Sequence, residues 1–242
     1  MDNKSDDKWH SIWAQRPDNL VLESSDALQN LILLDGFDTG AGDYTVESWR
    51  RMASAEVERH NLNPSTRVFE IGCGAGAFLF ALKEKCGCEV SGVDYSEKLI
   101  EAGSKIVDGN LEWGRADNLN CAEKSMDVVF SHGVFHYFPD LDYVETVIGQ
   151  CDNILKSGGS ISLMDICDKD KESIYHEERR KMYSDPSEYD RKYADLKHLF
   201  IDKTWLQDVL RSYNLTNIEF YPHAVAEYGN SEFRYNIYAE KQ

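Results

Sequence analysis

A glycine-rich loop and an acidic residue further along the chain could together bind a nucleoside. The loop Gly72–Gly76 reads G-x-G-x-G after the acid Glu70, and Asp94 stands eighteen residues past its last glycine. Glycines permit positive φ and let a ligand approach the backbone closely. An acid at the end of the next strand can accept hydrogen bonds from both ribose hydroxyls. These features predict a ligand that contains adenosine.

The spacing of the loop discriminates between adenosine ligands. A dinucleotide fingerprint reads G-x-G-x-x-G and holds a pyrophosphate at a helix N-terminus. This loop is one residue shorter, and the carboxylate of Glu70 would repel a pyrophosphate but suit a cation. The phosphate-loop pattern G-x-x-x-x-G-K-[ST] does not occur. The loop therefore favours S-adenosylmethionine, which carries both adenosine and positive charge.

The segment Ser131–Phe138 combines two histidines with three aromatic residues. Methyl transfer is an in-line displacement, so much of the catalysis consists of placing the nucleophile about 3–3.5 Å from the methyl group. A base is needed only where the nucleophile must lose a proton, and histidine suits that role because its pKa lies near neutrality. His136 is the first candidate for a base or substrate-orienting group, Tyr137 the second and His132 the third. The alternative is that these side chains only orient or pack the segment.

The cysteines and acids do not suggest a metal site. Six cysteines stand at positions 73, 86, 88, 121, 151 and 167 without a C-x-x-C pair, so we expect reduced thiols. The segment after Phe130, which carries the candidate histidines, contains no acid until Asp140. We therefore expect no catalytic metal.

Alternating strands and helices must position these residues. Short apolar runs predict five strands, at residues 67–71, 89–93, 111–113, 126–130 and 160–166, and two more near 218–221 and 235–239 close the chain. The clearest helical pattern between them has apolar residues from Leu141 to Leu155. Such alternation predicts a doubly wound α/β fold with a mostly parallel sheet. Ligands of such sheets sit at the carboxyl ends of the strands.

Caps and glycines predict where several helices begin and end. Ser157–Gly159 should stop the long helix, and Ser96 should cap a helix that carries Val107. Thr204 and Gln207 resemble a capping box for the last helix. Residues 9–34 should form one or two helices and residues 45–60 another.

Together these motifs resemble the class I S-adenosylmethionine-dependent methyltransferases. The resemblance covers residues 64–167, and the matching segments are Val68–Gly76, Val93–Ser96, Gly114–Asp117, Asp127–Ser131 and Leu155–Gly159. It implies a seven-stranded sheet whose last strand is antiparallel. We expect one methyltransferase domain over residues 1–242, made of a leader (1–60), a core that binds the methyl donor (64–167), a helical lid insertion (168–203) and a closing helix with two strands (204–242).

The resemblance also implies roles for single residues around S-adenosylmethionine. The glycines Gly72, Gly74 and Gly76, with Cys73 among them, would bend around its methionine portion, and Glu70 would interact with its amino group. Asp94 would hold the ribose hydroxyls, and Tyr95 would lie against the adenine. Asp117 would accept from the adenine amino group with Asn118 beside it, and Ser131 would face the amino-acid end. Each role has an ordinary alternative. Glu70 could be a solvated loop acid and Asp94 a cap of the next helix, while Tyr95 could only pack and Asp117 could be a turn residue.

Segments added to the core should select the acceptor. The leader brings Trp9, Trp13, Phe37 and Tyr44, and the insertion at 168–203 is rich in tyrosine. In small-molecule enzymes of this family such segments form a lid whose closure excludes water and places the acceptor. The alternative is that these aromatic residues cover the outer faces of the sheet.

The overall charge limits the classes of partner. Lys and Arg number 26 and Asp and Glu 43, which gives a formal net charge of −17. This balance disfavours nucleic acid and anionic membrane surfaces. No run approaches 18 apolar residues, and the acidic start lacks an apolar signal segment. We therefore expect a cytoplasmic location.

These observations predict a metal-independent methyltransferase that uses S-adenosylmethionine and acts on oxygen or nitrogen of a small molecule. A protein or RNA methyltransferase is the nearest alternative. A partner subunit that binds S-adenosylmethionine without catalysing is a second. A dinucleotide-dependent reductase is disfavoured by the loop spacing.

Overall fold

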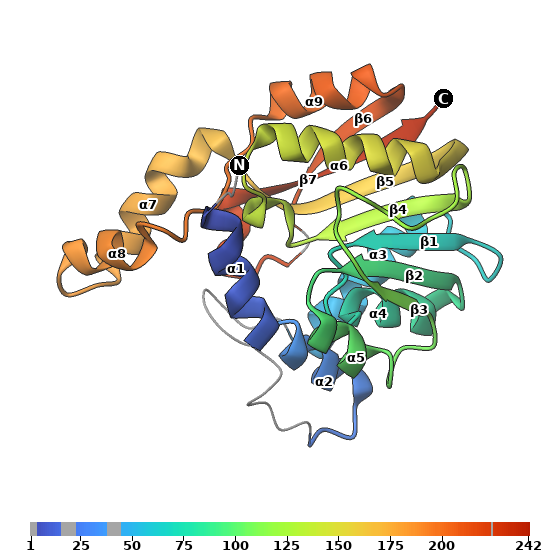
Figure 1. The fold of residues 1–242 in the computed structure, drawn as a ribbon, viewed down its shortest axis with the longest axis horizontal. Coiled ribbons are helices and arrows are strands. Elements are labelled where there is room, and N and C mark those ends of the chain that lie inside the picture. The colour runs from blue at the N-terminus through green and yellow to red at the C-terminus, as the bar shows by residue number, and fades with distance from the viewer. Residues whose placement is uncertain (1–3, 16–22, 38–44, 224) are drawn as a thin grey trace.

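Seven strands form one continuous sheet in the computed structural model, which describes residues 4–15, 23–37, 45–223 and 225–242 (Figure 1). They are β1 (Arg67–Ile71), β2 (Glu89–Asp94), β3 (Asn110–Trp113), β4 (Met126–His132), β5 (Leu155–Cys167), β6 (Leu215–Pro222) and β7 (Arg234–Lys241), in the order β3-β2-β1-β4-β5-β7-β6. Strands from β3 to β5 pair in parallel, and β7 pairs antiparallel with both β5 and β6. Only the last of these strands is reversed, which confirms the expected fold class.

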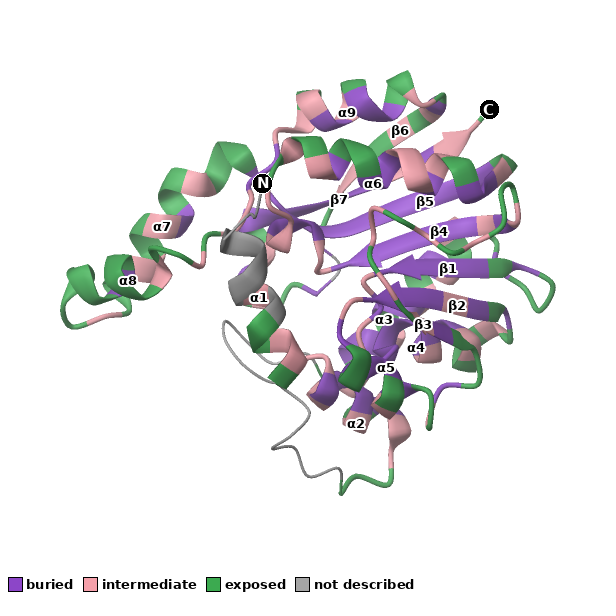
Figure 2. Ribbon diagram, in the orientation of Figure 1, coloured by how far each residue is buried: buried purple, intermediate pink, exposed green. Residues whose placement is uncertain are grey.

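Helices cover both faces of the sheet. On one face α2 (Ala27–Leu34), α3 (Val46–Arg59), α4 (Ala77–Cys86) and α5 (Glu97–Gly103) pack with Val68, Val128 and Phe130. On the other face α6 (Leu141–Ile154) and α9 (Lys203–Ser212) pack with Val129, Ile161 and Leu163. Because both faces are covered, the central strands are buried almost continuously (Figure 2).

The parallel arrangement brings three predicted segments to one edge of the sheet. β1, β2 and β4 run in the same direction, so their carboxyl ends at Ile71, Asp94 and His132 lie at the same edge. The glycine loop follows β1 directly, and the histidine-containing segment follows β4. Residues far apart in the chain are thereby collected where an α/β sheet binds its ligands.

Three expected helix boundaries are wrong. Helix α6 ends at Ile154 because Leu155 already pairs with Met126 of β4, so Ser157–Gly159 lies inside β5. Helix α5 ends at Gly103, before Val107. Helix α9 is capped by Asp202, whose carboxylate accepts from the Trp205 N–H at 2.8 Å, rather than by a box that begins at Thr204. Strand pairing therefore ends α6 before the glycines are reached, and a carboxylate closer to the start of α9 serves as its cap.

Two helical segments lie outside the layers. Helix α1 (Lys4–Gln15) lies across the carboxyl edge of the sheet (Figure 1), where the Trp13 carbonyl accepts from the Ser96 hydroxyl at 3.3 Å. Helices α7 (Glu172–Lys181) and α8 (Pro186–Tyr193) pack on each other and project from the body, and most of their residues are exposed (Figure 2). The segment that carries α7 and α8 leaves the body of the protein and returns to it at the same place, because Asp168 and Ile201 form a parallel bridge. None of the described helices has the length and apolarity that crossing a membrane requires.

Candidate functional site

The glycine loop has a backbone conformation that only glycine adopts easily. Gly72, Gly74 and Gly76 have φ of 68°, 56° and 88°. A Cβ on Gly72 would lie 2.5 Å from a Val134 methyl group, and one on Gly74 would lie 2.3 Å from a carboxylate oxygen of Asp35. Both positions therefore require glycine for close approach as well as for φ.

Asp94 ties the end of β2 to the loop. Its Oδ2 accepts from the Gly74 N–H at 2.9 Å, and its Oδ1 accepts from the Ser96 N–H at 2.8 Å. The Cys73 N–H adds a bond of 3.0 Å to the Val93 carbonyl. A carboxylate oxygen can accept more than one hydrogen bond, so these contacts are compatible with the predicted role of Asp94 toward ribose hydroxyls. The structure thus brings together the loop and the acid predicted to bind adenosine.

Asp35, at the end of α2, also contacts the loop, and the sequence analysis missed it. Its Oδ1 accepts from the Ala75 N–H at 2.6 Å and its Oδ2 from the Ala77 N–H at 3.1 Å. The carboxylate therefore occupies the N-terminus of α4, where unpaired N–H groups attract anions. In the sequence Asp35 precedes Gly36 after an apolar helix, so it resembles an ordinary turn residue.

Glu70 is a buried acid without a hydrogen bond to one of its oxygens. The residue is 2% exposed, and its Oε2 has no hydrogen-bond partner among the described residues. Burial first, and then the negative charges of Asp35 and Asp94, raise the pKa of Glu70 well above its usual value. A ligand cation would relieve both effects, because it attracts the carboxylate and supplies hydrogen-bond donors.

The residues predicted to surround the adenine lie beside β2 and β3. The Tyr95 carbonyl accepts from the indole N–H of Trp113 at 3.0 Å, and Trp113 itself is 64% exposed at the end of β3. Asp117 forms an ion pair with Arg115 at 3.0 Å, and Asn118 beside it is exposed. Trp113 was not singled out from the sequence, where one aromatic residue in a short strand resembles packing.

The segment after β4 separates its two histidines. Ser131 is buried, and its hydroxyl donates to the Ile71 carbonyl at 3.1 Å. His132 stacks on Phe37 with ring centroids 5.2 Å apart and meets the edge of Trp49 at 5.1 Å. Burial lowers the pKa of His132 to about 4, so the imidazole is neutral. His132 thus packs among aromatic rings on the α2–α3 face.

His136 and Tyr137 lie in a 3₁₀ turn (Phe135–Tyr137) beneath α1. The His136 imidazole is buried, and burial lowers its pKa well below the usual value. Its Nδ1 has no hydrogen-bond partner among the described residues. The Tyr137 ring lies 4.7 Å from Trp9 of α1, and burial raises the pKa of the Tyr137 hydroxyl. Among the leader aromatics, Trp9, Trp13 and Phe37 therefore lie at this edge, whereas Tyr44 is outside the described residues.

A further charged group, also missed from the sequence, lies at the end of β5. Asp165 is 2% exposed and has φ of 61°. Its Oδ1 lies 3.5 Å from His223 Nε2 and 3.7 Å from Arg234 Nε. In the sequence Asp165 stands in an apolar strand, and Arg234 is almost 70 residues away. Only strand pairing between β5 and β7 reveals the cluster.

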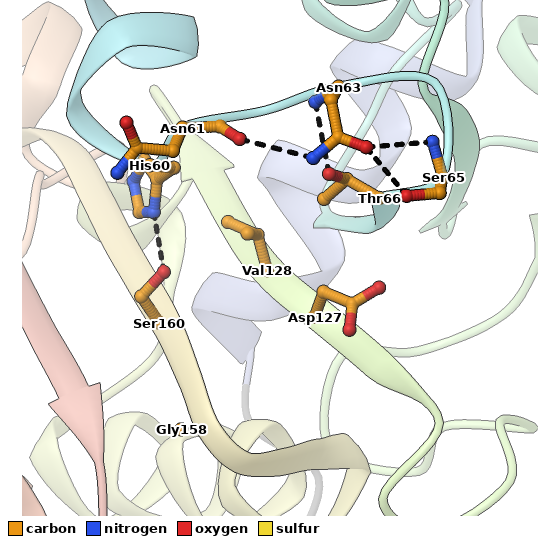
Figure 3. Close-up of a pocket in the computed structure, with 9 residues that line it drawn as sticks. All are labelled: His60, Asn61, Asn63, Ser65, Thr66, Asp127, Val128, Gly158 and Ser160. Carbon is orange, nitrogen blue, oxygen red and sulfur yellow. Dashed lines mark hydrogen bonds between the residues drawn. The ribbon is translucent and has the colours of Figure 1, made fainter.

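A polar pocket of about 270 Å³ lies at the opposite edge of the sheet (Figure 3). His60 Nδ1 and the Ser160 hydroxyl are 2.6 Å apart there, and the Asn63 side chain accepts from the backbone and the hydroxyl of Ser65. Behind the pocket, the Ser162 hydroxyl donates to Glu56 Oε2 at 3.0 Å. Because these groups satisfy one another and lie at the amino ends of β4 and β5, we assign the pocket no part in cofactor binding.

The residues at the carboxyl edge fit S-adenosylmethionine. The bent glycine loop admits a ligand close to the backbone, and the Asp94 carboxylate beside the loop is an acceptor of the kind that ribose hydroxyls require. Glu70 Oε2, which has no hydrogen-bond partner in the part of the chain that the structure describes, suits an ammonium group. Within the described part of the chain no three His, Cys, Asp or Glu residues are grouped so that they could hold a metal ion.

Comparisons with known proteins agree with this geometry. Residues 69–163 match the family model described as a methyltransferase domain. Phosphoethanolamine N-methyltransferase 1 of Arabidopsis thaliana is 27% identical over 156 residues, which cover 62% of this chain and 30% of that protein. Ribosomal RNA small subunit methyltransferase C of Alcanivorax borkumensis is 29% identical over 113 residues, which cover 45% and 34%. The chain thus spans about a third of the length of these curated relatives.

Solved structures show the same fold. A SAM-dependent methyltransferase from Thermotoga maritima superposes with a TM-score of 0.56 over 81% of this chain and 91% of its own. The two sequences are 21% identical, so the likeness concerns the fold.

Proposed function

The domain at residues 69–163 belongs to the class I S-adenosylmethionine-dependent methyltransferases, and from that premise we propose that this chain methylates oxygen or nitrogen of a small-molecule acceptor. The observation that carries the proposal is the joining of Asp94 to the glycine loop at Gly74 beside the buried Glu70. This arrangement supplies acceptors for ribose hydroxyls and for an ammonium group at one place. When bound, S-adenosylmethionine supplies an activated sulfonium methyl group.

The chain's own residues then have distinct tasks. Glu70 accepts from the ammonium group, Asp94 holds the ribose, and the loop backbone follows the methionine portion. Tyr95 and Asp117 lie at the adenine end. His136 holds or removes a proton on the acceptor, since its neutral imidazole has a buried nitrogen without a partner among the described residues. Placement of the acceptor in line with the methyl group supplies much of the remaining rate.

Helix α1 and the 168–203 insertion are proposed as the cover of the acceptor site. Trp9 of α1 contacts Tyr137, and its indole N–H donates to the Lys197 carbonyl at 3.4 Å, so the leader and the insertion meet over His136. An acceptor could reach His136 only if this cover moves, because the imidazole is 4% exposed. Such closure would exclude water during transfer.

A small-molecule acceptor is favoured over RNA. The net charge of −17 opposes binding to a polyanion. The relative from Alcanivorax borkumensis keeps RNA as the second candidate, and phosphoethanolamine enzymes support the first. The six cysteines are all free thiols, which suits the cytoplasmic location that we propose.

Calorimetry first tests cofactor binding, and a methyl-transfer assay then tests the activity. S-adenosylmethionine or its demethylated product should bind, and NAD should show no comparable binding. Incubation of the protein and labelled S-adenosylmethionine with a small-molecule extract should then yield a labelled product. Tight NAD binding without S-adenosylmethionine binding would overturn the cofactor assignment. Cofactor binding without any labelled product would indicate a non-catalytic partner subunit, and labelling confined to RNA would favour the second candidate.

A further inference from the structure

Helix α4 obtains its N-terminal cap from another helix. Its own N-cap position is Gly76, which has no side chain that could accept from the first N–H groups. Asp35, at the end of α2, accepts from the Ala75 and Ala77 N–H groups instead, at 2.6 and 3.1 Å. Serine and asparagine cap helices as well as aspartate does, so a cap requires an acceptor but no charge. The negative charge of Asp35 thus exceeds what the cap requires.

A second carboxylate is bound to the preceding N–H group of the loop. Asp94 Oδ2 accepts from the Gly74 N–H at 2.9 Å, directly before the Ala75 N–H that donates to Asp35. Two carboxylates, one from α2 and one from β2, are therefore held on consecutive residues of one loop. Like charges this close repel each other. The N-terminus of α4 compensates only in part, because it carries about half a unit of positive charge.

Glu70 adds a third acid, two residues before the glycine loop. Its side chain is buried, and its Oε2 has no hydrogen-bond partner among the residues that the structure describes. Burial, and then the negative charges of Asp35 and Asp94, raise the pKa of Glu70 well above its usual value. A bound cation would counter the repulsion, because it attracts all three carboxylates at once. The surroundings of the loop therefore favour a positively charged ligand.

The geometry of these acids indicates an organic cation. In the described ranges no three His, Cys, Asp or Glu side chains are grouped closely enough to coordinate a metal ion. Both oxygens of Asp35 already accept from backbone N–H groups. Asp35 would therefore act on a ligand through its charge, which extends beyond contact distance in a partly buried site.

We propose that Asp35 is a positioning residue that also selects the methyl donor by charge, favouring the sulfonium of S-adenosylmethionine over the neutral thioether of the demethylated product. The inference rests on the proposed function and deepens it. When the methyl group passes to the acceptor, the carbon–sulfur bond breaks with its electron pair remaining on sulfur, so the ligand loses one positive charge. The carboxylates around the loop then attract it less, which promotes release of the product.

Two ligands of nearly the same shape measure this selection. S-adenosylmethionine and its demethylated product differ by one methyl group and the positive charge on sulfur. Calorimetry of the wild-type protein should give a lower Kd for S-adenosylmethionine than for the product. Equal or reversed affinities would overturn the inference while leaving the proposed transfer intact.

Asp35→Asn removes the charge and keeps an oxygen that can cap α4. We expect its Kd to rise roughly tenfold for S-adenosylmethionine but only about twofold for the product, so the ratio of the product Kd to the donor Kd should fall roughly fivefold. A loosened loop alone would weaken both ligands by the same factor. An unchanged ratio in the folded variant would therefore overturn the role of Asp35.

Asp26→Asn is the matched control at the other end of α2. Asp26 accepts from the Leu28 N–H at 3.0 Å and pairs with Arg50 at 3.2 Å, so this variant loosens α2 without changing the charge at the loop. Its ratio of the two Kd values should equal that of the wild type. If Asp35→Asn does not fold, Asp35→Ser supplies another neutral cap. The wild-type comparison decides the inference even if neither variant folds.

The same calorimetry separates failure of this inference from failure of the proposed function. Absence of S-adenosylmethionine binding would overturn both. Binding with the expected ratios but without a labelled product from the small-molecule extract would support selection by charge and overturn the proposed transfer.

Discussion

The Asp94 carboxylate accepts a hydrogen bond from the Gly74 backbone N–H at 2.9 Å, so the acid that ends β2 and the loop after β1 form one unit. The same carboxylate also accepts from the Ser96 N–H, which orients the start of α5. Loss of the side chain would therefore affect the loop conformation together with the ribose contact that we propose.

Asp94→Ala should weaken the binding of S-adenosylmethionine by about 1–3 kcal/mol, or roughly 5- to 150-fold in Kd, because charge-assisted hydrogen bonds are lost. Isothermal calorimetry measures the change. Glu123→Ala, in an exposed loop at the other edge, should bind normally. An Asp94→Ala protein with wild-type affinity would remove Asp94 from the ribose site.

Gly74→Ala and Gly158→Ala form a matched pair at positive φ. Their φ values are 56° and 78°, so both variants carry a left-handed strain of about 1–2 kcal/mol. Only the new Cβ at position 74 meets another atom, Asp35 Oδ1 at 2.3 Å, whereas position 158 has nothing within 4 Å. We expect Gly74→Ala to lose more stability in urea titrations and to bind the cofactor at least tenfold more weakly. Equal behaviour of the two variants would argue against a tightly packed loop.

His136→Ala should separate chemistry from binding. If the imidazole removes a proton, kcat should fall about 10²–10⁴-fold while cofactor affinity barely changes. The pH–rate profile should also lose the limb that reports the ionisation of the His136 imidazole. A rise in KM with an unchanged profile would instead mean that His136 orients the acceptor. Tyr137→Phe, which keeps the ring against Trp9, tests whether the neighbouring hydroxyl contributes.

Stability should fall as the solution is acidified below about pH 6.5, the ordinary histidine pKa. Burial lowers the pKa values of His60, His132 and His136, that of His132 to about 4, so the unfolded chain binds more protons in this range. Each such group removes up to about 1.4 kcal/mol per pH unit from the free energy of unfolding. The raised pKa of Glu70 acts in the opposite direction, because the folded state then binds the extra proton.

His132→Phe isolates one of these contributions. Urea titrations at pH 6 and pH 5 should show a loss of stability that is about 1 kcal/mol smaller in the variant than in the wild type. His176→Gln, at a half-buried imidazole, should change the loss less. An identical pH dependence in wild type and His132→Phe would contradict burial of a neutral His132.

Methyl transfer to an identified acceptor should survive EDTA. The reason is that β4 ends in Ser131 and His132 without a following acid until Asp140. The assay compares initial rates before and after chelation. Activity that disappears with EDTA and returns with Mg²⁺ would show that the site had been misread.

The local sequence pattern was sufficient for the strands, the α/β class and the glycine turn after β1. A continuous apolar run followed by glycines signals a buried strand and its turn, and both signals lie within a few residues. The errors arose because a local pattern does not include contacts with distant residues. The long helix was predicted to end at Ser157–Gly159, but it ends earlier because Leu155 pairs with Met126 of β4. The last helix was predicted to begin at Thr204, but the carboxylate of Asp202 caps it. In both cases a contact outside the local pattern decided the boundary.

Tertiary structure alone decided which charges meet. Asp35 reaches Ala75 and Ala77 from another helix, and Asp165 lies beside Arg234 only because β7 pairs antiparallel with β5. In the sequence Asp35 resembles an acid in a turn, Asp165 an acid within a strand, and Arg234 a residue far from both. Their chemistry depends on their burial and on distances of a few ångströms between them. Both are set only when the strands pair and the packed chain excludes water from the carboxyl edge of the sheet.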